Sequence, residues 1–309
     1  MAAAVSGLSA DGRSVRAAVL GSPISHSLSP VLHLAAYAAL GLTWWRYDAI
    51  ECNEATLPGF LDSCGPDWAG LSLTMPLKRT VLPLLDRAEP LVTEVGGANT
   101  VICAAAQRLG YNTDVPGMVR ALAEHGVGRV LPGTAGLAAS RQSSRAGDAG
   151  PALILGGGAT ACSALAALRN LGERSATAAV RDPGRTSELR SAADRLGMEL
   201  TLTPIATPEI GTEVRLVIST VPAGVADPYA ECFPALVLNP PALLDVVYHP
   251  WPTPLASAAS QAGAVVAGGF DLLLHQATAQ VELMTGRPAP VEVMRAAGLA
   301  ELARRSSAM

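Results

Sequence analysis

The sequence predicts an α/β protein of two domains, the second built on an open, doubly wound parallel sheet. Its 309 residues, 50% of them hydrophobic, are enough for two cores. In the second half, short apolar runs alternate with helix-like segments, which is the pattern of βαβ units. One of these runs, Ala152–Leu155, leads directly into three consecutive glycines and then into small residues suited to a helix start.

The composition argues against several classes of protein. A formal net charge of -4 disfavours a general nucleic-acid binder, which needs a basic surface. The five cysteines are scattered and the five histidines lack metal-ligand spacing, so we expect reduced thiols, no metal site and a cytoplasmic location. We expect no signal peptide and no membrane span, because the most hydrophobic stretch, 31–45, is short and interrupted.

The first strand is expected at Ala17–Leu20, before a turn rich in hydroxyl groups. Ser29 and Pro30 predict the start of the following helix, with Ser29 as its cap. Ser25 and Ser27 lie between the strand and this helix, where α/β folds tend to bind ligands. The two serines are equally compatible with plain turn formation.

Two more strands, Trp45–Ile50 and Ala69–Thr74, are expected around a helix near Glu54–Asp62. Lys78 then follows Pro76 beside an expected helix start, where a cation opposes the helix dipole. Local conflicts of this kind favour a functional residue. A solvated surface lysine is the alternative interpretation.

The next strands, 98–102 and 107–111, are expected to pair as a hairpin. The segment Asn112–Asp114 follows, and its side chains either close an Asx turn or point into a cleft. A helix from Pro116 to about His125 comes next, and the polar segment 128–150 is expected to be a mobile loop.

The glycine turn predicts a phosphate-binding site. Gly156, Gly157 and Gly158 let the backbone approach a pyrophosphate, and the N–H groups of the helix that begins near Thr160 can hold the anion. A glycine turn without a ligand is the alternative, since the spacing is not the usual G-x-G-x-x-G.

The residues after the next strand bear on the choice of dinucleotide. Arg181 stands where an NAD site usually has an acidic residue, and Arg185 follows it. Two guanidinium groups suit the extra phosphate of NADP. Asp182 could instead reach the ribose diol, so NAD is the less favoured alternative.

The remaining strands complete the sheet of the second domain, and the last helices of the chain are expected to belong to the first domain. The C-terminal helices Asp271–Met284 and Val291–Arg304 have no strand after them, so we expect them to return to the first domain. Thr253 is expected to cap a helix that begins with Pro254. The other expected elements of the second domain are the strands Ala152–Leu155, Ala176–Val180, Glu199–Thr203, Arg215–Thr220, Leu236–Leu238, Leu243–Val247 and Ala264–Val266 and the helices Thr160–Leu171 and Thr186–Leu196.

Together these pieces resemble the family of shikimate dehydrogenases along most of the chain. Their order and spacing carry the resemblance more than any single motif does. The matching segments are Ser25–Pro30, Ser72–Lys78, Ala98–Thr100, Asn112–Asp114, the glycine turn, Asp245–Tyr248 and Gly269–Gln276.

The resemblance implies an N-terminal α/β substrate domain of residues 1–118 plus 271–309 and a Rossmann-like NADP-binding domain of residues 119–270, with a deep groove between them. It implies reversible hydride transfer between NADPH and 3-dehydroshikimate, which forms shikimate for aromatic amino-acid (chorismate) biosynthesis. The implied partners are small molecules rather than nucleic acid or a membrane, and the implied assembly is a monomer or homodimer.

The resemblance also implies roles for individual residues. Lys78 and Asp114 would be the catalytic pair, the ammonium stabilising or protonating the developing oxyanion and the carboxylate holding the lysine in its charged form. The substrate-binding residues would be Ser25, Ser27, Thr74, Asn99, Tyr248 and Gln276, and the cofactor-binding residues Gly156, Gly157, Gly158, Ala159, Arg181, Arg185, Val246 and Gly269.

Three positions depart from the usual pattern of the family, namely Ser72, Ala159 and Asp182, and none removes a catalytic group. Two alternatives stay open. A relative could act on quinate or an amino-substituted analogue, and a non-catalytic sensor could bind shikimate-type ligands. Retention of both Lys78 and Asp114 speaks against the sensor.

Overall fold

The computed structural model describes residues 14–128, 152–206 and 214–307. The chain forms two compact units, of which unit 1 comprises Met1–Asp114 and Leu273–Met309 and unit 2 comprises Val115–Leu272. The sequence predicts these changes of domain after residues 118 and 270. Apart from Gly128, the loop expected at 128–150 lies outside the described residues.

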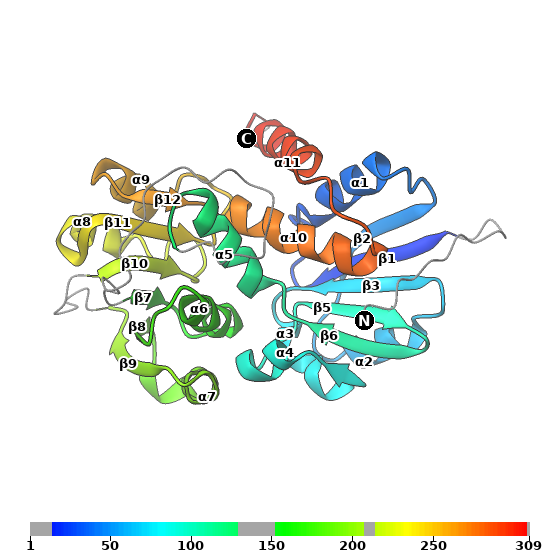
Figure 1. The fold of residues 1–309 in the computed structure, drawn as a ribbon, viewed down its shortest axis with the longest axis horizontal. Coiled ribbons are helices and arrows are strands. Elements are labelled where there is room, and N and C mark those ends of the chain that lie inside the picture. The colour runs from blue at the N-terminus through cyan, green and yellow to red at the C-terminus, as the bar shows by residue number, and fades with distance from the viewer. Residues whose placement is uncertain (1–13, 129–151, 207–213, 308–309) are drawn as a thin grey trace. The chain divides into compact units, whose positions relative to one another are not determined.

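Unit 1 contains a mixed six-stranded sheet with short helices between its strands. The strands are β1 Val15–Gly21, β2 Trp45–Glu51, β3 Trp68–Leu73, β4 Arg87–Ala88, β5 Thr100–Ala104 and β6 Gln107–Tyr111, and the helices are α1 Ser29–Ala39, α2 Leu57–Ser63, α3 Leu77–Thr80, η1 Leu82–Leu84 and α4 Pro90–Val95. The strand order is β2-β1-β3-β5-β6-β4 (Figure 1). Strand β1 runs parallel to β2 and β3, whereas β5 runs antiparallel to β3 and β6.

The connections of unit 1 diverge between β1 and β3. From β1 the chain crosses through α1 to β2 on one side, and α2 then leads back to β3 on the other side. The loops that follow β1 and β3 therefore start at neighbouring carboxyl ends. Such a switch point is where parallel α/β sheets bind ligands.

Unit 2 contains a six-stranded sheet whose neighbouring strands are paired in parallel. Its strands are β7 Ala152–Leu155, β8 Ser175–Val180, β9 Glu199–Pro204, β10 Val214–Ser219, β11 Val237–Asp245 and β12 Val265–Ala267, and its helices are α6 Ala159–Asn170, η2 Pro183–Arg185, α7 Ser187–Leu196, α8 Pro228–Leu236 and α9 Pro254–Gln261. The order β12-β11-β10-β7-β8-β9 is that of a doubly wound dinucleotide-binding sheet (Figure 1). The predicted fold class is confirmed.

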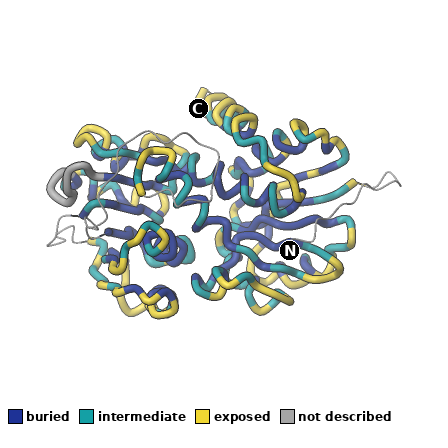
Figure 2. Tube along the Cα trace, in the orientation of Figure 1, coloured by how far each residue is buried: buried dark blue, intermediate teal, exposed yellow. Residues whose placement is uncertain are grey.

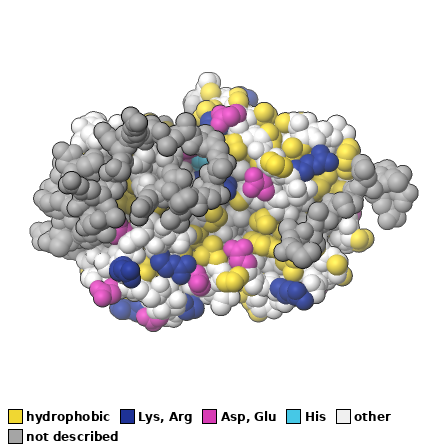
Figure 3. Space-filling model, in the orientation of Figure 1, with side chains coloured by type: hydrophobic (Ala, Val, Ile, Leu, Met, Phe, Trp, Pro, Cys, Tyr) yellow, Lys and Arg dark blue, Asp and Glu magenta, His cyan; other side chains and the backbone are white. Residues whose placement is uncertain are grey.

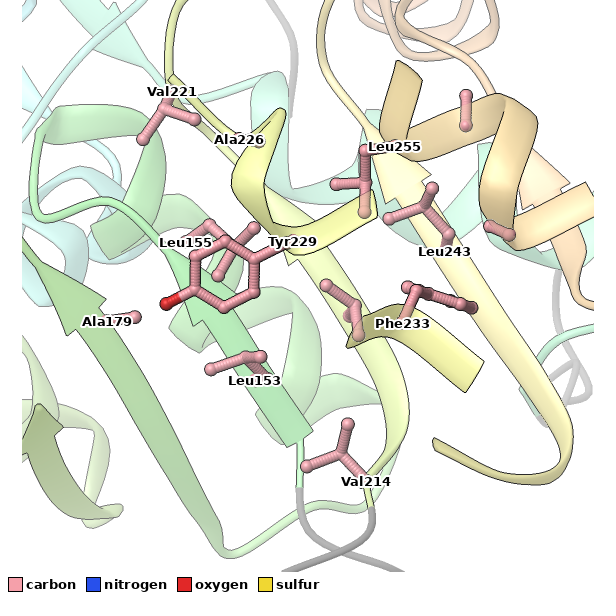
Figure 4. Packing of buried hydrophobic residues seen from close by; sticks show 13 residues of the cluster. Leu153, Leu155, Ala179, Val214, Val221, Ala226, Tyr229, Phe233, Leu243 and Leu255 are labelled. Carbon is pink, nitrogen blue, oxygen red and sulfur yellow. The ribbon is translucent and has the colours of Figure 1, made fainter. Parts of the chain in front are cut away.

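The core of unit 2 lies between its sheet and the helices that cover it. Leu153 and Leu155 of β7 pack with Tyr229 and Phe233 of α8 and with Leu255 of α9 (Figure 4). The strands in the middle of each sheet are buried along most of their length, whereas helices such as α7 have both buried and exposed residues (Figure 2). This distribution explains the near-continuous apolar runs of the parallel strands.

Two helices cross from one unit to the other along the chain, α5 (Asp114–Glu124) and α10 (Gly269–Thr285). Most of α10 and all of α11 (Val291–Ser306) belong to unit 1. Helix α11 packs against α1, and Arg305 donates a 2.6 Å hydrogen bond to the carbonyl of His26. The expected return of the C-terminal helices is confirmed.

Some local predictions are wrong. Ser29 is not a side-chain cap, because α1 already includes it and its N–H instead donates to Ser27 Oγ at 3.2 Å. The two strands expected at 236–238 and 243–247 are the single strand β11, with a register shift against β10. Prolines interrupt the apolar run in the sequence, but a strand can accommodate proline at a bulge.

The cap at Thr253 is confirmed, one predicted helix begins later than expected, and two helices were not predicted. Thr253 caps α9, and its hydroxyl accepts the N–H of Ala256 at 3.0 Å. The helix expected at 54–62 begins later, at Leu57, after a turn in which the Asn53 side chain accepts backbone N–H groups. Helices α4 and α8 have no counterpart in the sequence-based prediction, since both are short and begin with proline.

The acid stability of the protein should depend on His33. This side chain is fully buried, is stacked on Tyr47 at 3.9 Å between ring centroids, and burial lowers its pKa from 6.5 to about 3. The unfolded chain therefore binds a proton that the native protein excludes, and the free energy of unfolding should fall as pH drops from 6.5 towards 3.

Urea unfolding between pH 4.5 and 7.5, a range of about three units across the ordinary histidine pKa, would measure this effect. We expect His33→Gln to flatten the pH dependence relative to wild type. The exposed His26 provides the control, since His26→Gln should leave the slope unchanged. A His33→Gln profile parallel to that of wild type would contradict the assignment.

Candidate active site

Two loops meet at the switch point of unit 1. The N–H of Thr74 donates to the carbonyl of Leu20 at 2.9 Å, and the N–H of Ser22 donates to the carbonyl of Met75 at 3.0 Å. Gly21 is required at this contact, because a Cβ there would collide with the side chain of Thr74. The end of β1 and the end of β3 are thus fixed to each other.

Lys78 and Asp114 form a close ion pair. Nζ of Lys78 lies 2.6 Å from Oδ2 of Asp114, and the side chains are only 16% and 8% exposed. Lys78 lies in α3, just after the end of β3, and its carbonyl accepts the N–H of Ala98 at 2.8 Å. Asp114 begins α5, where a carboxylate is favoured by the helix dipole.

Asn99 connects this pair to the substrate residues expected nearby. Its Oδ1 accepts the backbone N–H of Thr113 at 2.7 Å, which fixes the orientation of the amide because that N–H can only donate. Its Nδ2 therefore faces Oδ1 of Asp114 at 2.8 Å and Oε1 of Gln276 at 3.3 Å. Four of the predicted site residues are in one hydrogen-bonded group, namely Lys78, Asp114, Asn99 and Gln276.

The other predicted substrate residues have different positions. Ser25 is exposed in the loop after β1, and Ser27 in the same loop is half-buried. Thr74 is half-buried at the contact between the loops that follow β1 and β3. Tyr248 belongs to unit 2 and is half-buried after β11.

A buried carboxyl group organises the segment that contains Tyr248. Asp245 ends β11, accepts the hydroxyl of Thr253 at 2.7 Å and accepts the N–H of Val247 at 3.2 Å. Burial raises its pKa, partly offset by these hydrogen bonds. Val246, in the same segment, lies against Gly269, where a Cβ would collide with the Val246 carbonyl. The two residues predicted from these separate motifs to bind the cofactor are therefore neighbours.

The glycine turn lies at the switch point of the unit 2 sheet, between β7 and the start of α6. Gly156 has φ +116°, and a Cβ there would meet Oγ1 of Thr220 at 2.5 Å. A Cβ at Gly157 would meet Val180 at 3.1 Å, whereas Gly158 is exposed and has no such neighbour within 4 Å. The first N–H groups of α6, which begins at Ala159, need partners from outside the helix.

Arg181 and Arg185 are both exposed after β8. Asp182 between them accepts the N–H of Gly184 through Oδ1 at 2.9 Å and so caps the short helix η2. This bond occupies part of the carboxylate that could otherwise reach a ribose diol. The arrangement suits a phosphate better than a diol.

Some polar residues of the unit 1 site have no counterpart among the predicted site residues. Thr100, Thr113 and Gln280 are buried and contact Asn99. Gln280 is four residues after Gln276 in α10, so the two share a helix face, and this spacing is a signal that the sequence contains.

The described residues contain neither a metal-binding group nor a membrane-spanning helix. Among the described residues, no group of three or more His, Cys, Asp and Glu side chains could hold a metal ion. Within the same residues, no helix is both long and apolar enough to pass through a bilayer. On the face shown in Figure 3, the visible basic and acidic side chains are interspersed.

Comparison with known proteins identifies the class of this fold and site. The family model for the shikimate dehydrogenase substrate binding domain matches residues 19–101, and the model for the shikimate 5'-dehydrogenase C-terminal domain matches residues 269–297. The shikimate dehydrogenase (NADP(+)) of Geobacter metallireducens is 33% identical, over 93% of this chain and 96% of that protein.

Solved structures agree. Shikimate dehydrogenase from Mycobacterium tuberculosis is 40% identical with a TM-score of 0.77, covering 93% of this chain and 99% of that one. The shikimate 5-dehydrogenase of Thermus thermophilus, solved in complex with NADP(H) and shikimate, is 30% identical with a TM-score of 0.75, covering 93% and 99%. This two-unit α/β protein thus has the fold of an oxidoreductase. The chain belongs to the shikimate dehydrogenase family, which confirms the resemblance drawn from the sequence.

The turn glycines should differ sharply in their tolerance of a side chain. Gly156→Ala places a Cβ in a left-handed conformation and against Thr220, so it should destabilise unit 2 by about 1–3 kcal/mol and weaken NADP binding. Gly158→Ala should leave the melting temperature close to that of wild type. Thermal unfolding of both variants checks this, and equal melting temperatures would contradict it.

Proposed function

We propose that this chain is an NADP-dependent shikimate dehydrogenase, which reversibly reduces 3-dehydroshikimate to shikimate in aromatic amino-acid biosynthesis. The observation that carries the proposal is the Lys78–Asp114 ion pair, hydrogen-bonded through Asn99, in unit 1 of a chain whose unit 2 has a dinucleotide-binding glycine turn. The names of its relatives support the same activity.

In this proposal, Lys78 and Asp114 manage the proton at the reacting oxygen. Reduction of a ketone places negative charge on its oxygen, and a positioned ammonium stabilises that charge or supplies the proton. The carboxylate of Asp114 fixes the position of Nζ through the 2.6 Å contact. Because both side chains are largely sheltered from water, their contact is less screened than a surface ion pair.

Recognition of the substrate is assigned to polar side chains. Shikimate is a small ring with a carboxylate and hydroxyl groups, so selectivity must come from hydrogen bonds that a wrong ligand leaves unmade. We assign the carboxylate and hydroxyl contacts to Ser25, Ser27, Thr74, Asn99, Tyr248 and Gln276. Asn99 and Gln276 suit this role because their amides are held within the network around Asp114.

The residues of unit 2 fit a bound NADP. When bound, NADP(H) supplies or accepts the hydride. Gly156 leaves no room for a Cβ and Gly157 leaves little, so both permit close backbone approach, while the N-terminus of α6 can hold phosphate. We assign the extra phosphate to Arg181 and Arg185, and the remaining contacts to Gly158, Ala159, Val246 and Gly269.

The proposal also covers the alternative substrates, the oligomeric state and the location of the protein. Quinate or an amino-substituted analogue is the second candidate substrate, since it would use the same Lys78–Asp114 pair with a different set of ring contacts. A non-catalytic sensor would not need that pair. We retain the sequence-based predictions of a monomer or homodimer, without nucleic-acid or membrane partners, in the cytoplasm.

The central test is the effect of Lys78 on turnover. We expect wild type to form NADPH with shikimate, and Lys78→Met to lower kcat by about 10²–10⁴-fold, the range ascribed to one acid–base group. The shikimate Kd should change much less, because several other side chains bind the ring. Asp114→Asn should also lower kcat.

The same assay, with quinate and an amino analogue in place of shikimate, separates the alternatives. Faster turnover of quinate or the analogue would transfer the assignment to that substrate. Binding without turnover for all three compounds would favour the sensor and contradict the enzyme.

Cofactor choice should depend on the arginines after β8. Arg181→Ala and Arg185→Ala each remove a charged donor, so the KM for NADP should rise about tenfold or more while the KM for NAD stays nearly constant. The exposed Arg174, at the opposite end of β8, gives the matched control. A parallel rise in both KM values would instead show a general loss of binding.

A further inference from the structure

A line of buried hydrogen bonds leads from the core of unit 1 to the ion pair, and every donor in it points the same way. Each member is at most 5% exposed. In order, the side chains are Tyr47, Ser72, Gln280, Thr100, Asn99 and Asp114.

The first half of the line leads from Tyr47 through Ser72 to Gln280. The hydroxyl of Tyr47 donates to Ser72 Oγ at 2.7 Å, and that hydroxyl donates to Oε1 of Gln280 at 2.8 Å. The orientation of the Gln280 amide is fixed, because its Nε2 faces the carbonyl of Asn99 at 3.3 Å and a carbonyl can only accept. His33 stacks on Tyr47 and is 3.4 Å from the same Oε1.

The second half of the line leads from Gln280 to the carboxylate of Asp114. Nε2 of Gln280 donates to Oγ1 of Thr100 at 3.0 Å, and that hydroxyl donates to Oδ1 of Asn99 at 3.0 Å. Nδ2 of Asn99 then donates to Oδ1 of Asp114 at 2.8 Å. Because each hydroxyl or amide both accepts and donates, the bonds polarise one another in the direction of the carboxylate.

We propose that Thr100 and Gln280 are positioning residues, which act together with the backbone N–H of Thr113 to hold the Asn99 amide in the one orientation that donates to Asp114. This inference rests on the proposed function for its effect on rate, but the positioning itself does not require a substrate. If the Asn99 amide were rotated, its Oδ1 would face the carboxylate of Asp114. Both groups only accept hydrogen bonds, so Asp114 would lose the hydrogen bond that it receives from Asn99.

The decisive variants are at Thr100. Thr100→Val keeps the shape but removes the hydroxyl, whereas Thr100→Ser keeps the hydroxyl. Thr278 is an equally buried threonine of unit 1 whose hydroxyl returns to the carbonyl of Leu274 in its own helix at 2.9 Å, so Thr278→Val is the matched control.

We expect Thr100→Val to lower kcat about tenfold or more, with the KM for NADP unchanged. Thr100→Ser should stay within about threefold of wild type, and Thr278→Val should not alter kcat, although both valine variants lose a hydroxyl. A merely structural role would reduce the melting temperature of both valine variants without this difference in kcat. Equal kcat values in Thr100→Val and Thr278→Val would overturn the proposal.

A second measurement does not need turnover. The side-chain NH₂ of Asn99, assigned by comparison with Asn99→Asp, should exchange slowly with solvent in wild type and in Thr100→Ser and faster in Thr100→Val. Unchanged exchange in Thr100→Val would overturn the positioning role even if wild type has no activity with any substrate. If Thr100→Val does not fold, Gln280→Met breaks the same line one step earlier, and the same two outcomes apply to it.

Discussion

The contact between Lys78 and Asp114 is the constraint on which unit 1 depends. Two opposite charges that are mostly withdrawn from water lose hydration, so they persist only where geometry and further hydrogen bonds compensate. The protein supplies that compensation from separate parts of the chain. Strand β3 leads to the lysine, the open end of the β5–β6 hairpin carries Asn99 before β5 and leads to the aspartate after β6, and α10 contributes Gln276 and Gln280. The mixed sheet and the returning C-terminal helices are the means by which these pieces meet.

In unit 2 the important feature is the backbone of the glycine turn rather than a group of buried polar side chains. A phosphate needs close access to backbone N–H groups, so the important property of Gly156 and Gly157 is the absence of a side chain. Among the residues that we expect to contact the cofactor, the charged ones are Arg181 and Arg185, which are exposed after β8. Unit 1 therefore relies on rigid, buried side chains and unit 2 on backbone shape, which is why substitutions in the two units should be tolerated so differently.

Much of this organisation could be predicted from the sequence, because it follows from apolar periodicity and turn chemistry. Most strands of both sheets, the cap at Thr253 and the return of the last helices are examples, whereas the short strand β4 was not predicted and β11 was predicted as two strands. The errors have physical causes. At Ser29, the predicted cap lies inside α1, and its N–H donates to Ser27 Oγ, which depends on how the loop folds. Thr100 was missed because its role depends on Gln280, which is 180 residues away in the sequence. The spacing of Gln280 from Gln276 places both on one helix face, but it does not indicate which residues of the sheet Gln280 contacts.

Lys78 is the only lysine in the sequence, and the other basic side chains are arginines and histidines. Selective isotopic labelling of lysine would therefore give a single side-chain nitrogen signal, without any need for assignment. Reagents that modify primary amines would have one target besides the chain's α-amino group. The ion pair thus provides its own spectroscopic and chemical reporter, so its protonation and accessibility can be followed directly as ligands are added.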